Sequence, residues 1–441
     1  MIRLSDHFDY KKLLRFTLPS IIMMVFTSVY GVVDGLFVSN FAGEIPFTAV
    51  NFIMPVLMIL GAVGYMFGAG GSALVAKTMG EGDKQKANRL FSLFVYVTAV
   101  CGVVLAVVAF IFLRPIASWL GAEGQLLDDC GLYGRIILVA LPFYMLQYEF
   151  QSFFITAEKP GLGLIVTVIA GCTNIAFDAL FVAVFDWGLV GAAVATALSQ
   201  AVGGIVPVFY FVFVRKGVLR LGRAKFDLKA ILQASANGSS ELMSNIAMSV
   251  VSILYNVQLL KYAEESGVAA YGVLMYANYM FVAVFIGYST GIAPVIGYHY
   301  GADDTKELKG LFRKSLILIG IFSVVMFVLG EALGYPLAKI FVGYNGELVK
   351  MTTKAFLIAS FSFLFSGFAI FGSSFFTALN NGLISALISF LRTLVFQVAA
   401  VLIFPLVWEL NGIWFSIVAA EIMAVAITVI FFIACRKKYR Y

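Results

Sequence analysis

Two stretches of the chain decide its fold: GGSALVAKTMGEGDKQKANRL at residues 70–90 and GIAPVIGYHYGADDTKELKGL at residues 291–311. Each joins an apolar run to a charged loop, and the second lies 221 residues after the first. The same offset aligns three further places: residues 154–157 (FITA) with 375–378 (FFTA), Gly191 with Gly412, and Ala49 with Ala270. Because separate places share one offset, the sequence predicts two copies of one structural unit.

The composition indicates that lipid surrounds most of this chain. Of 441 residues, 61% are hydrophobic and 12% are charged, about half the ~25% of an ordinary soluble domain. Mean hydropathy is +0.97. These values exclude a soluble enzyme, a disordered chain and a disulfide-stapled secreted domain. The four cysteines form no CxxC pair and the two histidines lie far apart in sequence, so we expect no metal site built from them.

Twelve apolar runs are long enough to span a membrane, which takes about 20 residues each. They are continuous rather than alternating, so they predict helices rather than the strands of a barrel. The runs are 13–41, 48–76, 90–113, 132–156, 161–185, 189–214, 231–260, 268–298, 311–335, 352–377, 383–406 and 412–434. The predicted fold is therefore an all-α integral membrane protein of two parallel six-helix bundles, related by a pseudo-two-fold axis along the membrane normal. Residues 1–214 and 231–441 form the two lobes, joined by a basic linker at 215–230.

The distribution of Lys and Arg predicts the orientation. The N-terminus, the even-numbered loops and the C-terminus carry 23 of the 30 basic residues, and one more, Arg392, lies inside a span. The opposite side has six: Arg114, Arg135, Lys261, Lys339, Lys350 and Lys354. Because basic loops stay in the cytoplasm, we expect both termini there, in a multi-pass protein of the cytoplasmic (inner) membrane. The net charge of +6 thus reflects topology rather than nucleic-acid binding.

Two lobes joined by a long linker favour rocking around a central site, so alternating access is the expected mechanism. The alternative is a static membrane scaffold. No Walker A, GxSxG or HExxH motif is present in the sequence, so we expect neither enzymatic activity nor ATP hydrolysis. Transport would then run on an ion gradient, since one charge crossing 100 mV yields ~2.3 kcal/mol.

Two acids inside the first copy are the candidate coupling site. Asp34 lies 19 residues past Arg15, and Asp178 lies 19 residues past Lys159, so both are about 28 Å from their cytoplasmic anchors. Asn174 lies one turn before Asp178 on the same face. We expect these three side chains to bind the coupling ion, H⁺ or Na⁺, with no other metal or cofactor. The alternative is that each Asp lies at a helix end in the outer interface.

The second copy lacks these acids, because Asp34 corresponds to Tyr255, Asp178 to Ala399 and Asn174 to Val395. A requirement of the repeated fold would have left similar residues in both copies, so the asymmetry favours a functional role.

The second copy has charged residues of its own, namely Glu241, Arg392 and Glu421. Glu241 is a candidate second cation- or proton-binding residue. The alternative is a structural Arg392–Glu421 ion pair with Glu241 at a helix end. Tyr30, Tyr255 and Tyr279 are candidate substrate contacts, because aromatic faces attract cations. The small-residue pairs Gly64/Gly68 and Gly287/Gly291 predict close helix contacts rather than binding elements.

The GEGD loop at residues 80–83, its GADD counterpart at 301–304 and the NIAFD stretch at 174–178 resemble the multidrug and toxic compound extrusion (MATE) family. The resemblance covers nearly the whole chain and is greater to the MepA/DinF branch than to the NorM branch. It implies efflux of organic, mostly cationic drugs in exchange for protons or sodium, and thereby resistance to antibiotics and other xenobiotics. It also implies a cation site at Asp34, Asn174 and Asp178. The partners expected are small-molecule drugs and the lipid bilayer, with no nucleic acid and with the chain as a monomer.

A second function remains open from the sequence: a flippase for lipid-linked oligosaccharides or lipids with the same superfamily fold. Such a protein would need basic residues for pyrophosphate, whereas the candidate residues here are mainly acids. A receptor would need larger external loops than these runs leave.

Overall fold

The computed structural model describes residues 2–38, 44–213 and 217–441, and the regular structure in those ranges is helical, without strands. The predicted span ends at 41 and 214, and the first linker residues Arg215 and Lys216, lie outside these ranges. An all-helical structure is what apolar runs must form in lipid, because a helix satisfies its own backbone hydrogen bonds.

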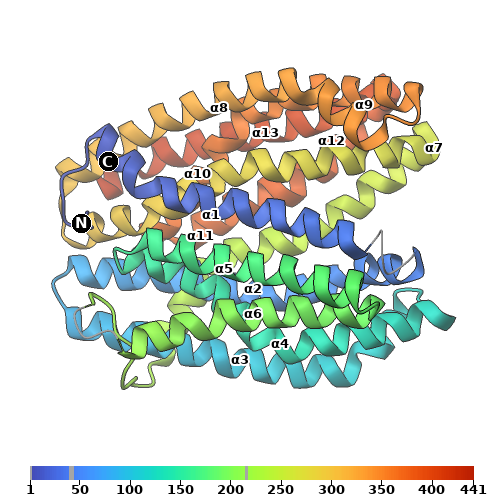
Figure 1. Ribbon diagram of the computed structural model, residues 1–441. Coiled ribbons are helices and arrows are strands. Elements are labelled where there is room, and N and C mark those ends of the chain that lie inside the picture. The colour runs from blue at the N-terminus through green and yellow to red at the C-terminus, as the bar shows by residue number, and fades with distance from the viewer. Residues whose placement is uncertain (1, 39–43, 214–216) are drawn as a thin grey trace. The chain divides into compact units, whose positions relative to one another are not determined.

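The helices follow the two-copy order of the sequence (Figure 1). The first copy comprises α1 (Tyr10–Phe37), α2 (Glu44–Gly80), α3 (Lys84–Trp119), α4 (Gly124–Thr156), α5 (Pro160–Asp178), the π-helix η2 (Ala179–Val184) and α6 (Gly188–Phe213). The second comprises α7 (Leu228–Gly301), α8 (Thr305–Val342), α9 (Gly346–Ala359), the short 3₁₀ turn η3 (Ser360–Ser362), α10 (Phe363–Ala378), α11 (Gly382–Phe390), the π-helix η4 (Leu391–Val395), α12 (Phe396–Ile403) and α13 (Pro405–Tyr439).

The described residues form twelve helical segments long and apolar enough to cross a membrane, which confirms the predicted number. Two spans lie within α7, which breaks at Glu264, where the backbone takes φ 51° and ψ −148°. The spans on either side are Leu228–Glu264 and Ser266–Gly301, so scarcely any loop separates them. Conversely, two other spans each contain several helical elements. One consists of α9, η3 and α10, and the other of α11, η4 and α12.

The chain divides into two compact units. The first unit comprises Met1–Asp6 and Phe26–Gly238, and the second comprises His7–Val25 and Ser239–Tyr441. These units differ from the predicted lobes, 1–214 and 231–441, in two places. The beginning of α1 belongs to the second unit, and the beginning of α7 belongs to the first.

Glycines explain this exchange, since they let two backbones approach closely. In the first unit, a Cβ on Gly238 of α7 would lie 1.9 Å from the carbonyl oxygen of Met66 on α2. In the second unit, a Cβ on Gly287 of α7 would lie 2.5 Å from the Cα of Ile21 on α1. Each of these helix crossings therefore requires glycine.

The predicted Gly64/Gly68 contact is also present, and it seats α2 on α4. A Cβ on Gly64 would lie 2.4 Å from the carbonyl oxygen of Met145, and one on Gly68 would lie 3.1 Å from the Cα of Glu149. Within the first unit α4 packs against α2, α3, α5 and α6. Polar residues on its buried face are thus enclosed by neighbouring helices.

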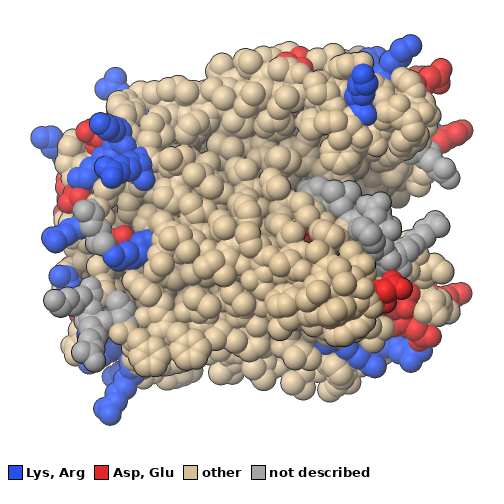
Figure 2. Space-filling model, in the orientation of Figure 1, with Lys and Arg blue, Asp and Glu red and all other residues tan. Residues whose placement is uncertain are grey.

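Charged side chains gather at the helix ends in each unit, and the sides between them are almost free of charge on the face shown in Figure 2. This pattern matches a chain whose sides contact lipid. The linker after α6 packs on α3, where the amide of Arg220 donates to Asn88 Oδ1 at 2.7 Å and the amide of Gly222 donates to Ser92 Oγ at 3.0 Å.

Candidate functional site

In the first unit, Asp34 of α1 and Asp178 of α5 lie together. Their equal predicted depth allows this contact. The carboxyl of Asp34 lies beside the side chains of Asp178, Asn174 and Thr196. Asp178 is fully buried, and α5 continues beyond it as the π-helix η2. Asp178 is therefore not an exposed helix-end residue. π-turns are rare and often occur at functional sites.

Several oxygen atoms at this site have no hydrogen-bond partner among the described residues. They are Asp34 Oδ1, both Asp178 carboxyl oxygens and Asn174 Oδ1. The Asn174 amide is oriented by one contact, in which Nδ2 donates to Thr196 Oγ1 at 3.5 Å. A buried, ionised carboxylate without a partner is costly, so these two neighbouring acids are candidates to bind a proton or a cation. The donor set consists of oxygens alone, which suits H⁺ or a hard cation such as Na⁺.

Thr196 was not identified from the sequence, although a signal was present. Asn174 and Thr196 are equally distant from residue 185, close to the turn between α5 and α6. In an antiparallel helix pair, residues equidistant from the turn lie at the same depth. The polar residue facing Asn174 from α6 was therefore predictable from the position of the turn.

Tyrosine side chains from α1 and α4 lie near the two acids. Tyr133 lies near both carboxyl groups, and Tyr30, a predicted candidate, lies near Asp34 and Tyr148. Tyr148 stacks on Tyr65 with ring centroids 3.9 Å apart. Tyr133 and Tyr30 thus lie next to the acids, and Tyr148 and Tyr65 extend the aromatic cluster beyond Tyr30. Of these four tyrosines, only Tyr30 was a candidate from the sequence.

The equivalent place in the second unit is neutral and internally hydrogen-bonded. Tyr255, which replaces Asp34 in the repeat, donates its hydroxyl to Gln397 Oε1 at 2.7 Å and lies 2.9 Å from Ser416 Oγ. Its ring stacks on Tyr271 with centroids 5.1 Å apart. Tyr255 is thus a buried, satisfied residue, unlike the acids of the first unit.

The remaining predicted residues of the second unit do not form one cluster. Arg392 and Glu421 make a two-pronged ion pair, with Nε 2.9 Å from Oε2 and Nη2 2.9 Å from Oε1. Glu241 lies on α7, where its carbonyl accepts from Asn245 Nδ2 at 2.8 Å. The side chain of Tyr279 is 44% exposed. The paired charges favour the structural alternative for Arg392 and Glu421.

No group of three or more His, Cys, Asp or Glu side chains that could hold a metal ion occurs in the described part of the chain.

In the described part of the chain, twelve helical segments long and apolar enough to cross a membrane define a multi-pass membrane protein. The MatE family model matches residues 19–180 and 242–403. Each match falls in one predicted copy, and together they cover most of the chain. The chain therefore belongs to the MatE family.

Two relatives are similar over nearly their full length. The multidrug export protein MepA of Staphylococcus saprophyticus is 23% identical over 440 residues, which cover 96% of this chain and 94% of the relative. MepA of Staphylococcus aureus is 23% identical over 413 residues, which cover 93% and 91%. The chain is thus a MATE-family, MepA-like transporter.

Solved structures share the fold. One is described as the outward-facing conformation of a multidrug resistance MATE family transporter of the MOP superfamily; it matches with a TM-score of 0.92 and 21% identity over 98% of this chain and 97% of the other. A MOP superfamily transporter from Pyrococcus furiosus matches with a TM-score of 0.90 and 21% identity over the same shares.

Proposed function

We propose that this protein exports organic, mostly cationic drugs by alternating access, in antiport with H⁺ or Na⁺ bound at Asp34 and Asp178. The observation that carries the proposal is the pair of neighbouring carboxyl groups, buried at Asp178 and half-buried at Asp34, in one of two otherwise matched repeats. The names of the MepA relatives, multidrug export proteins, support the substrate class.

The coupling step follows from the cost of a buried charge. With the site empty, two adjacent carboxylates repel each other and are poorly solvated. Binding of a proton or Na⁺ removes this penalty, so the loaded and empty states of the site differ in free energy. That difference can bias α1 and α5 between two arrangements, which is what an ion-driven transporter requires.

The direction of transport rests on the charge of the loops. Basic residues are concentrated at the N-terminus, the even-numbered loops and the C-terminus, and under the positive-inside rule this distribution favours a cytoplasmic location of both termini. Export then means that the drug crosses the cytoplasmic (inner) membrane and is released at the helix ends that lie opposite to the two termini.

The flippase alternative receives less support. It needs basic groups for a pyrophosphate, and Arg392, a basic residue inside a span of the second unit, is neutralised by Glu421.

Transport of a fluorescent organic cation into proteoliposomes tests the proposal, with pH and sodium gradients imposed separately. Asp34→Asn and Asp178→Asn should each abolish gradient-driven transport while leaving the amount of folded protein unchanged. Asp186→Asn is a matched control, because Asp186 is exposed in the loop after η2. Gradient-driven transport by Asp34→Asn at the wild-type rate would refute the coupling role.

A further inference from the structure

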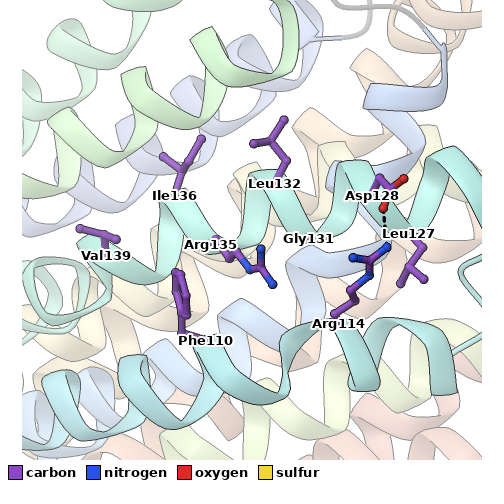
Figure 3. Close-up of a pocket in the computed structure, with 9 residues that line it drawn as sticks. All are labelled: Phe110, Arg114, Leu127, Asp128, Gly131, Leu132, Arg135, Ile136 and Val139. Atoms are coloured by element: carbon purple, nitrogen blue, oxygen red, sulfur yellow. Dashed lines mark hydrogen bonds and ion pairs between the residues drawn. The ribbon is translucent and has the colours of Figure 1, made fainter.

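An open groove of about 340 Å³ runs between α3 and α4 in the first unit. Its walls are mostly apolar and include Phe110, Leu132 and Val139 (Figure 3). Two arginines, Arg114 and Arg135, reach into it from the two helices. Asp128 also lines the groove, which therefore combines an apolar surface with a net charge of about +1, and neither the proposed ion site nor the antiport mechanism uses it.

The two arginines differ in their partners. Arg114 Nη2 lies 2.7 Å from Asp128 Oδ1, and both side chains are more than half exposed. Arg135 has no acidic partner among the described residues, and its guanidinium carbon lies 5.3 Å from the centroid of the Phe110 ring. In Figure 3 the Arg135 side chain extends along the groove toward Arg114. One positive charge thus remains without an anion.

The position of Arg135 makes that charge expensive in the absence of a ligand. It lies eleven residues after the first residue of α4, which is about 16 Å along the helix. Its neighbours Leu132 and Val139 are 45% and 69% exposed on the outer side of the unit, where lipid is the solvent. A cation on a lipid-facing surface needs either an anionic partner or a path to the interface.

The repeat shows that helix packing does not require these charges. At the offset of 221 residues, Arg114 corresponds to Tyr335 and Arg135 to Phe356. The equivalent helices, α8 and α9, pack in the second unit without arginine at either place. Phe356 is buried whereas Arg135 is exposed. The second unit has Lys339 on α8 and Lys354 on α9, so arginine at these two places, but not positive charge on this helix pair, is specific to the first copy.

We propose that this groove binds a membrane phospholipid. The phosphate diester accepts hydrogen bonds from the guanidinium groups of Arg135 and Arg114, whose planar donors match phosphate oxygens. An acyl chain lies along Phe110, Leu132 and Val139. Basic pockets between spanning helices recognise lipid head groups by the same chemistry.

Native mass spectrometry of the full-length protein in mild detergent, titrated with phosphatidylglycerol, tests the proposal. The wild type should bind this lipid, and Arg135→Gln should bind it about tenfold more weakly, which corresponds to about 1.4 kcal/mol. Arg135→Lys should retain most of the affinity. Lys339→Gln, a change of an exposed basic residue on α8, is the matched control and should bind like the wild type.

Two further measurements, one with a lipid that lacks phosphate and one with a variant that fills the groove, test the two parts of the proposed site separately. Diacylglycerol, which lacks the phosphate, should not bind at this site, and Val139→Trp should weaken phosphatidylglycerol binding by filling the groove without altering its charge. Val139→Trp also keeps the proposal testable if Arg135→Gln fails to fold. Wild-type lipid affinity in both Arg135→Gln and Val139→Trp would overturn the proposal. Displacement of the lipid by millimolar inorganic phosphate would overturn it too, because the site would then recognise free phosphate.

Discussion

Replacing Glu421 by glutamine leaves the guanidinium of Arg392 without an anion near the middle of two spanning segments. In the native structure both oxygens of Glu421 accept from Arg392, at 2.9–3.1 Å. The side chain of Arg392 is 18% exposed and that of Glu421 is 8% exposed. Water cannot replace the lost carboxylate at such positions, and a guanidinium cannot lose its proton to become neutral.

The magnitude follows from this geometry. Breaking a buried pair by removing one partner costs about 3–5 kcal/mol. A unit of about 200 residues loses roughly 2–4 °C of melting temperature per kcal/mol, so Glu421→Gln should melt at least about 6 °C below the wild type. Arg392→Met should cost less, because a solitary carboxyl group at Glu421 can take up a proton. The double variant Arg392→Met, Glu421→Leu should recover most of the loss, since apolar residues can replace a buried pair.

Thermal unfolding in detergent, followed by tryptophan fluorescence, measures these shifts. Glu409→Gln on the same helix is the matched control, because Glu409 is exposed. Drug transport by the double variant then separates structure from mechanism: a purely structural pair predicts transport close to the wild-type rate. If Glu421→Gln is as stable as the wild type, or if the double variant is no better than Glu421→Gln, the reasoning is refuted.

Two further predictions concern the proposed ion site and the loop between α4 and α5. Thr196→Val removes a hydroxyl oxygen beside Asp34. It should weaken Na⁺-driven transport about five- to tenfold, the effect of about 1 kcal/mol, but leave H⁺-driven transport intact. Thr173→Val, at a half-buried position on α5, is the control, and equal loss under both gradients would contradict the prediction. Partial burial raises the pKa of Glu158, whose Oε1 accepts from the amide of Leu4 at 2.8 Å. Because the folded state then holds this proton to a higher pH than the unfolded chain, the stability contribution is present below the ordinary pKa of about 4.3 and is lost as pH rises through the raised value. Glu158→Gln should therefore flatten the decline in melting temperature with rising pH, and an unchanged slope would count against this prediction.

The number and type of the spans could be predicted from the sequence alone. In lipid a helix satisfies its backbone locally, so length and composition of each apolar run suffice. At the offset of 221 residues, α3 corresponds to α8, and α4 corresponds to the span formed by α9, η3 and α10. The matching depths of Asp34 and Asp178, counted from basic anchors, predicted that the two acids could meet, and the structure brings them together.

Side-chain partnerships were decided by the tertiary structure, because they depend on which helices are neighbours and how each is rotated. The sequence left open whether Arg392 pairs with Glu421, and the packing of η4 against α13 settled their contact. Thr196 joined the acid site, and Tyr133 closed over it, through contacts of α6 and α4 that no single apolar run encodes. The exchange of the first parts of α1 and α7 between units likewise depends on close backbone crossings at glycine. Local hydropathy carries no information about such contacts between residues far apart in the chain.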